Sequence, residues 1–232
     1  MKYGRIVTLA LVAIIAAAIL APGALYAEAQ HEKHIRLAAE LLKTMGAESD
    51  AESFADSIKT SKGVAVFPTL IQAGIGIGGM TGEGVVLVRN QKGGWNGPSF
   101  VSLVGGSIGL QFGVQQVGLV LAIINDDGLL VFTGGQSFKL GGDVSIAAGP
   151  MGRKAEAATD SRAEASIYSY SMSKGLFAGL TLSGSTINVN GDANKAYWGK
   201  ATDAQEALKK TASGAKIKPL VDELNRLTKM SK

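Results

Sequence analysis

The chain has 232 residues, a formal net charge of +4 at pH 7, 31 glycines and no cysteine. Without cysteine, the protein has no disulfide, no thiol catalysis and no thiolate metal site. A small positive charge permits contact with anionic surfaces. Nucleic-acid binding usually needs denser clusters of lysine and arginine, so no nucleic-acid partner is expected.

Residues 1–29 predict a secretory signal peptide. Two basic residues precede an apolar run over residues 6–21, and small residues at 27 and 29 provide a cleavage site before Gln30. The alternative is an uncleaved membrane anchor, although the run is shorter than the roughly 20 apolar residues that a spanning helix needs. We therefore expect residues 30–232 to be exported as a single domain, either periplasmic or associated with the cell envelope.

Residues 32–45 predict the first helix of this domain, because apolar residues recur along it at helical spacing. Two interpretations of the helix stay open. In the first, its apolar stripe packs on the core, as in most amphipathic helices of globular domains. Alternatively, the helix lies in the headgroup region of a bilayer with Lys33, Arg36 and Lys43 toward anionic lipid.

A short second helix is predicted from a cap at Ser49 or Asp50 through Phe54 and Ile58. From Val64 onward, apolar residues recur at every second position, which is the period of a β-strand. Short strands are predicted over residues 64–67, 74–80, 85–88, 99–104, 108–114 and 117–124.

Two of these strands, 85–88 and 117–124, are apolar throughout, as is typical of strands covered on both faces. Pro68 is expected to end the first strand. A turn is predicted over residues 125–128, and the composition of residues 129–133 predicts one more strand.

The glycines lie inside the predicted strands rather than in a linker. Glycine in a strand permits bulges, sharp coiling and close approach of backbones. A strongly bent antiparallel sheet uses glycine in this way. The predicted fold class is therefore α+β, with a strongly curved, mainly antiparallel, glycine-rich β-sheet or partly closed barrel and with N- and C-terminal helices packed on it.

The segment 138–185 contains two further alternating runs, over residues 140–146 and 176–183. Before the second run lies Ser173-Lys174-Gly175, whose glycine can take the positive φ of a tight turn. We predict a β-hairpin with Lys174 at its tip.

The remaining chain predicts a turn over residues 188–192 and the end of the sheet region at 197–199. Thr202 is expected to cap a short helix that reaches Lys210. Pro219 begins a last helix with three leucines on one face.

Three short motifs resemble catalytic or nucleotide-binding patterns but lack their context. The pattern Gly-x-Gly-x-x-Gly at residues 74–79 fits a dinucleotide fingerprint, yet strand rather than helix is predicted after it. Tyr170 and Lys174 have the spacing of the catalytic pair of short-chain dehydrogenases, which lies on a helix. Ser171 and Lys174 have the spacing of the penicillin-binding enzymes, whose partner motifs are absent from this sequence.

His31 and His34 are the only histidines. Two ligands near a frayed helix end would make a weak metal site, so we interpret both as solvated helix residues. We predict no catalytic residue, no metal site and no cofactor.

Six sequence blocks occur together between about residues 63 and 199: KGVAVFP, GIGGMTGEGVVLV, WNGPSF, GGSIGLQFGVQ, LGGDVSIAAGPMGR and SYSMSKGLFAGLTLSGS. In this order they resemble the SYLF domain family, also called the Las17-binding or Ysc84-like family, and indicate a bacterial, exported member. The resemblance implies a non-catalytic domain that binds phosphoinositides and other anionic phospholipids. It also implies a short helix over residues 129–133 instead of a strand.

Eukaryotic members of the family also bind actin and its regulators. Actin is not expected as a partner of an exported protein. Lipid binding would use cations for headgroup phosphates and apolar surface for the acyl boundary. The candidate lipid-binding residues are Lys139, Arg153, Lys154, Arg162 and Lys174, together with Lys33, Arg36 and Lys43.

Three alternatives to lipid binding stay open. In the first, the cations are solvated loop charges, as charged surface residues usually are. In the second, the protein is a structural or interaction protein of the periplasm that holds an apolar ligand or an envelope protein partner. In the third, it is an oxidoreductase that uses Tyr170 and Lys174, and NAD(P) would stabilise it against heat.

Overall fold

Two very long strands form the centre of the protein, whose computed structural model describes residues 22–49, 51–134, 137–150, 165–174, 176–178, 180 and 182–230. Strand β1 (Gly63–Arg89) pairs antiparallel with β2 (Trp95–Ile123), and a turn at residues 90–94 joins them. The six short strands expected between residues 64 and 124 are therefore parts of two continuous strands. Pro68 does not end β1, because a register shift between Phe67 and Leu70 accommodates it.

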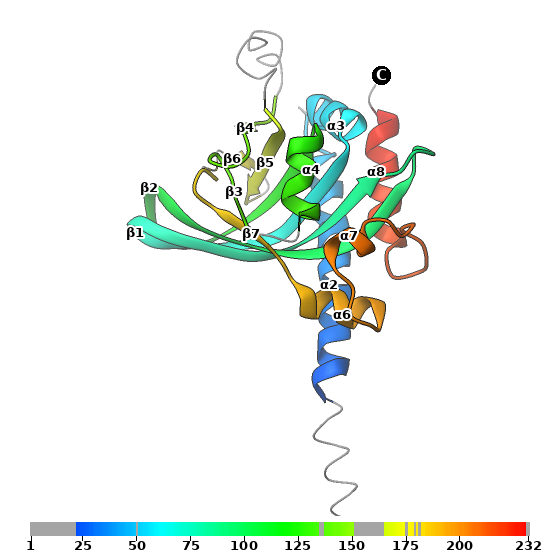
Figure 1. Cartoon of the computed structure of the whole chain (residues 1–232). Helices are drawn as coiled ribbons and strands as arrows, with labels where there is room; N and C mark the ends of the chain where they lie inside the picture. The colour runs from blue at the N-terminus through cyan, green and yellow to red at the C-terminus, as the bar shows by residue number, and fades with distance from the viewer. Residues whose placement is uncertain are drawn as a thin grey trace, which may run out of the picture.

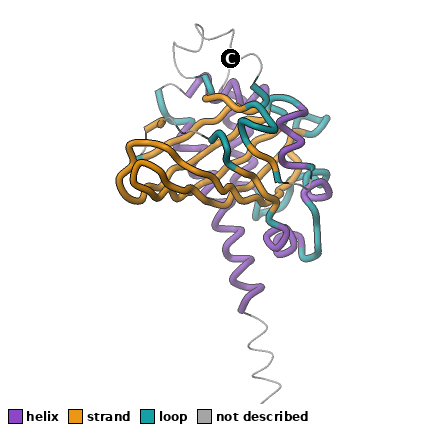
Figure 2. Tube along the Cα trace, turned by 60° about the vertical axis from the view of Figure 1, so that its left-hand side comes forward, coloured by secondary structure: helices purple, strands orange, loops and turns teal. Residues whose placement is uncertain are grey.

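The β1–β2 ribbon bends sharply midway, near the pairs Ile75 with Phe112 and Ile77 with Ile108. The inner faces of its two halves then meet. A Cβ placed on Gly82 would lie 2.5 Å from the carbonyl oxygen of Thr69, and one on Gly84 would lie 2.6 Å from the ring of Phe67. Glycine is needed at these points because any side chain would separate the two halves. Figures 1 and 2 show the bend projecting beyond the helices on one side of the protein.

Two shorter strands extend the opposite halves of β2. Strand β5 (Ile167–Ser173) pairs with residues 118–123, and β7 (Thr186–Val189) pairs with residues 101–104. Strand β6 (Leu176–Ala178) pairs with β5, so the predicted hairpin is confirmed. Lys174 lies at its turn with a φ of 51°, and thus itself adopts the left-handed conformation expected of the neighbouring glycine.

The remaining described strands are β3 (Phe138–Lys139), which pairs antiparallel with β7, and β4 (Ile146–Ala148), which pairs parallel with β5. The seven strands make one curved, mainly antiparallel sheet in the described part of the chain. The predicted α+β class with a strongly curved sheet and packed terminal helices is confirmed.

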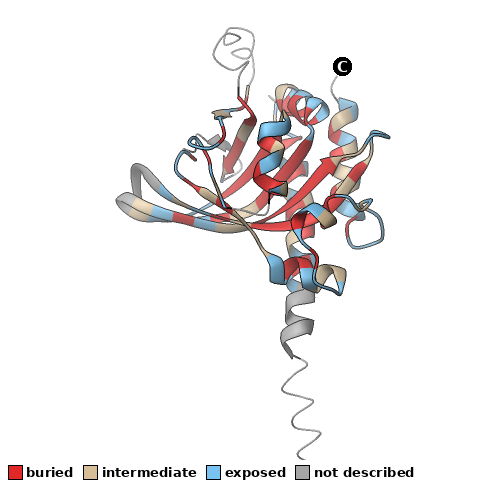
Figure 3. Ribbon diagram, viewed as in Figure 1, coloured by how far each residue is buried: buried red, intermediate tan, exposed pale blue. Residues whose placement is uncertain are grey.

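Both faces of the sheet are covered by apolar side chains. On the outer face, residues such as Val64 and Leu87 pack against helices α2 (Pro22–Met45), α3 (Ala51–Thr60) and α8 (Lys218–Met230). On the inner face, residues such as Phe67 and Val86 form a second core closed by α4 (Asp126–Thr133). The prediction that 85–88 is covered on both faces is confirmed. Figure 3 shows that burial decreases toward the bend.

Helix α2 packs its apolar stripe on the core. Ile35, Ala38, Leu42 and Met45 are at most 1% exposed and lie in the outer core with α8. This is the first of the two interpretations given above, and it leaves that stripe covered by protein. Helix α2 begins earlier than expected, and the predicted cleavage before Gln30, which falls within it, stays a prediction. Among the described residues, no helix is both long and apolar enough to cross a bilayer.

The strand predicted over residues 140–146 is wrong over most of its length. Residues 141–143 form a turn, with Gly141 at a φ of 76°. The carboxylate of Asp143 accepts a hydrogen bond from the backbone N–H of Lys139 at 2.8 Å, which closes this turn. Residues 129–133 belong to α4, so the helix implied by the family resemblance is right and the strand predicted from composition is wrong.

The turn predicted over residues 188–192 is a strand end followed by helix α6 (Gly191–Trp198). The side chain of Asn190 caps this helix by accepting the N–H of Ala193 at 3.0 Å, and Gly199 ends it with a φ of 72°. Helix α7 (Ala204–Ala207) is shorter than expected and has Asp203 as its cap. Helix α8 buries the three predicted leucines.

The glycine contacts in the bent ribbon can be tested by substitution. Gly82→Ala should lower the free energy of unfolding by about 1–3 kcal/mol, because the added methyl group meets backbone that cannot move away cheaply. Gly106→Ala is the matched control, since its Cβ would meet nothing within 4 Å, and it should change stability by less than about 0.5 kcal/mol. Urea unfolding measures both variants, and equal effects would contradict the close approach described here.

Candidate functional site

The described residues include five of the eight predicted lipid-binding cations. Their side chains are all exposed: Lys33, Arg36, Lys43, Lys139 and Lys174. Arg153, Lys154 and Arg162 lie outside the described residues. The five described cations fall into two groups, one near the bend of the ribbon and one on α2.

Lys139 and Lys174 lie at the bend end of the sheet, although 35 positions separate them in the sequence. Lys139 is level with Val104 of β2, because β3 pairs with β7 and β7 pairs with β2. Lys174 follows β5, whose Met172 pairs with Gly118 of β2. The bend lies between Val104 and Gly118. Strand pairing therefore places both lysines toward the bend. Figure 1 labels β3, which carries Lys139, and β5 and β6, which flank Lys174.

Exposed apolar side chains gather at this end as well. The described part of the chain contains six large apolar residues with high exposure, and four belong here. They are Ile71, Val104, Val114 and Leu176, which are 45%, 51%, 72% and 69% exposed. We call these four residues with Lys139 and Lys174 the bend surface. It combines positive charge with apolar area, and this combination suits an anionic, amphipathic partner.

The cations of α2 form a different environment. Lys33 and Arg36 line an open hollow of about 410 Å³ together with Lys216 near the start of α8. Acidic residues lie within this group: Glu40 is 3.4 Å from Arg36, and Glu32 is 2.8 Å from Lys216. These carboxylates offset part of the local positive charge, and Asp143, whose carboxylate accepts the backbone N–H of Lys139, does the same at the bend. The bend surface therefore differs from this group in its exposed apolar side chains rather than in its charge.

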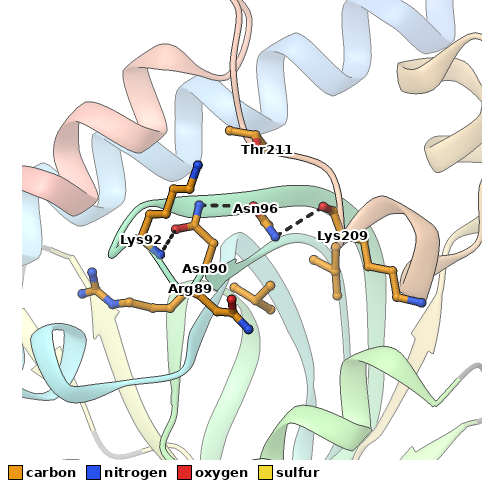
Figure 4. Close-up of a pocket in the computed structure, with 9 residues that line it drawn as sticks. Arg89, Asn90, Lys92, Asn96, Lys209 and Thr211 are labelled. Atoms are coloured by element: carbon orange, nitrogen blue, oxygen red, sulfur yellow. Dashed lines mark hydrogen bonds between the residues drawn. The ribbon is translucent and has the colours of Figure 1, made fainter.

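A second hollow, of about 470 Å³, lies away from the bend, between the β1–β2 turn and residues 208–211 (Figure 4). Three cations and no acidic residue line it, and no sequence pattern pointed to it. Figure 4 shows that Arg89, Lys92 and Lys209 point in different directions rather than toward one centre.

The polar groups of this second hollow already serve the fold. The Arg89 guanidinium donates to the carbonyl oxygen of Ile58 at 3.0 Å and lies 4.3 Å from the centre of the Trp95 ring. The amide of Asn90 donates to Asn96, whose own amide donates to the carbonyl oxygen of Lys209. The hollow is therefore better explained as a braced turn than as a binding site.

Tyr170 has a structural contact in place of the role suggested by its spacing from Lys174. Its hydroxyl donates to Ser57 Oγ of α3 at 2.6 Å, and its ring packs edge-on against Phe54 at 4.9 Å. The side chain is 2% exposed, whereas Lys174 is exposed at the hairpin turn. This geometry gives the oxidoreductase alternative no support.

The sequence matches known proteins over most of its length. The model of the family described as "Ysc84: Las17-binding protein actin regulator" matches residues 104–227. The chain belongs to the Ysc84 family. It is 35% identical over 174 residues to LAS seventeen-binding protein 3 of Saccharomyces cerevisiae, covering 74% of this chain and 37% of the relative.

Two further relatives in the Ysc84 family show the same partial overlap. Protein YSC84 of Saccharomyces cerevisiae is 33% identical over 172 residues, which cover 73% of this chain and 36% of that protein. SH3 domain-containing YSC84-like protein 1 of Bos taurus is 32% identical over 151 residues, which cover 65% of this chain and 44% of that protein. The chain thus spans less than half the length of these curated relatives.

Sequence patterns did not reveal the apolar half of the bend surface of this Ysc84-family chain. Val104 and Val114 were assigned to strands and Ile71 to no element, and strand periodicity does not reveal which positions a helix leaves uncovered. A usable signal is the absence of charge around the bend, since no charged residue occurs over residues 63–82 or 93–125. The prediction of solvated histidines is wrong: His31 is 6% exposed, and its ring lies 4.8 Å from that of Phe100.

His34 gives this Ysc84-family chain a testable pH dependence. Its Nδ1 lies 3.3 Å from Glu83 Oε2, yet burial lowers the pKa of His34 below 6.5, with Glu83 opposing and Lys33 adding to the effect. Below pH 6.5 the unfolded chain binds a proton that the folded protein resists, so the free energy of unfolding should fall as the pH falls.

Urea unfolding at about pH 7.5 and about pH 5.5 measures this effect, with His34→Gln as the comparison. The variant should lose less stability between the two pH values than the parent protein, because it lacks the titrating group. An unchanged difference between the two pH values would show that His34 does not contribute.

Proposed function

We propose that this chain is a non-catalytic protein that binds anionic phospholipid at a membrane surface. The observation that carries the proposal is the bend surface, where Lys139 and Lys174 share one end of the sheet with four exposed apolar side chains. Lysines near an anionic bilayer attract headgroup phosphates, and apolar side chains gain by leaving water at the acyl boundary.

The magnitudes fit reversible binding. Each lysine close to an anionic surface contributes about 1 kcal/mol, and full burial of a valine or leucine side chain contributes about 1.5–3 kcal/mol. Arg153, Lys154 and Arg162 are further candidates for the same role. The predicted signal peptide over residues 1–29 supports the cell envelope as the place where this lipid contact occurs.

Vesicle binding tests this function. The purified protein should co-sediment with vesicles that contain phosphatidylglycerol and not with vesicles of phosphatidylcholine alone, and binding should weaken as salt rises. Lys139→Glu and Lys174→Glu should each weaken binding by about 5- to 30-fold, which corresponds to about 1–2 kcal/mol. Lys195→Glu on α6 reverses an exposed charge away from the bend and should leave binding unchanged. Binding that ignores lipid charge and salt would reject the proposal.

A protein partner is the second candidate, and the descriptions of the relatives favour it. The family model is described as a Las17-binding actin regulator. The bend surface would then contact a protein of the envelope, and affinity would not depend on lipid charge. We expect no co-sedimentation with actin filaments, since the predicted signal peptide directs the chain away from actin. A pellet that contains both proteins in stoichiometric amounts would refute that expectation.

A further inference from the structure

The bend of the β1–β2 ribbon consists entirely of uncharged residues. No Asp, Glu, Lys, Arg or His occurs over residues 63–82 of β1 or over residues 93–125 of β2 and its flanks. Ordinary protein surfaces mix charges of both signs at about a quarter to a third of their positions. Ribbon segments with no charge and with exposed apolar side chains therefore differ from a normal solvated edge.

The apolar side chains of the bend continue the outer face of the sheet past its helical cover. Val104 lies four positions from Phe100 and Val114 six positions from Val120, so each pair points to the same face of the sheet. Phe100 and Val120 are buried beneath the helices, whereas Val104 and Val114 are 51% and 72% exposed. Past the helices the outer face thus carries exposed apolar side chains beside uncharged polar ones such as Ser102 and Gln116.

We propose that the bend of the ribbon inserts into an anionic phospholipid bilayer, with Lys139 and Lys174 contacting the headgroup phosphates. This inference rests on the proposed function and adds the element that enters the bilayer. Charge complementarity favours this occupant: Lys139 and Lys174 outnumber the one carboxylate that contacts this surface, that of Asp143, which accepts the backbone N–H of Lys139. A second copy docked end to end would bring like charges together.

The backbone limits the depth of insertion. In the described strands, β2 pairs on its second edge with β7 at residues 101–104 and with β5 at residues 118–123. No such pair is formed over residues 105–117 by the strands that the structure describes. Backbone groups without a partner are costly in hydrocarbon. The bend therefore lies at the boundary of headgroups and acyl chains, about 5–10 Å deep, as interfacial helices do.

The absence of native cysteine allows one reporter to be placed on the bend. Val114→Cys is labelled with the polarity-sensitive fluorophore NBD in the full chain. Leu130→Cys on α4 is the matched control, because Leu130 is 53% exposed and does not belong to the bend surface. With phosphatidylglycerol vesicles, the label at 114 should show a blue shift and a severalfold rise in emission, while the label at 130 stays unchanged.

Binding is measured on the same samples by co-sedimentation, so that the two proposals can fail separately. Vesicle binding without a response at 114 would overturn insertion and leave the proposed function intact. An absence of vesicle binding would overturn both. A response at 114 that rises with protein concentration in the absence of vesicles would show that a second copy covers the bend, and would also overturn insertion.

Neutral polar variants separate insertion from electrostatic attraction. The double variant Val104→Gln and Val114→Gln keeps the net charge and should weaken binding to phosphatidylglycerol vesicles by about tenfold or more. Leu130→Gln should bind as the parent protein does. Equal affinity of the double variant and the parent protein would overturn the insertion of the bend.

Discussion

The fold depends on the inner contact between the two halves of the β1–β2 ribbon. Gly82 and Gly84 let the backbone near Thr69 and the ring of Phe67 come close, so a two-stranded ribbon can coil instead of staying flat. Once the ribbon is coiled, its two halves offer separate edges to β5 and β7, an inner core forms under α4, and the outer face is left for α2, α3 and α8.

Much of this architecture follows from sequence periodicity, and its limits have physical causes. The two-residue period located the strands, and uniformly apolar runs identified strands buried on both faces. The continuity of β1 through Pro68 could not be predicted. Proline has no backbone N–H to donate and is tolerated inside a strand at a bulge, and the bulge here depends on how β1 pairs with β2. The alternation over residues 140–146 was misleading, since glycine and Asp143 favour a turn as readily as a strand edge.

The candidate site was predictable in composition but not in arrangement. Sequence identified Lys139 and Lys174 as surface cations, yet their shared position arises from two strand pairings, through β7 and through β5, that no local pattern specifies. The exposure of Val104 and Val114 depends on where the helical cover ends. Helix α6 was missed although Asn190 and Gly199 mark its two ends, because both residues are equally typical of turns.

The turn and the bend of the ribbon are held differently. At the turn end, Arg89 binds carbonyl groups of α3 and Trp95 Nε1 donates to Asn225 of α8 at 3.1 Å. In the described part of the chain, the strand pairing at the bend is that of β1 with β2, because β5 and β7 pair with β2 on either side of the bend. The ribbon is thus held by helices at its turn, whereas its bend projects beyond them. Hydrogen exchange should be slowest beside Trp95 and fastest near the bend, where the strand pairing can open without disturbing the contacts at the turn.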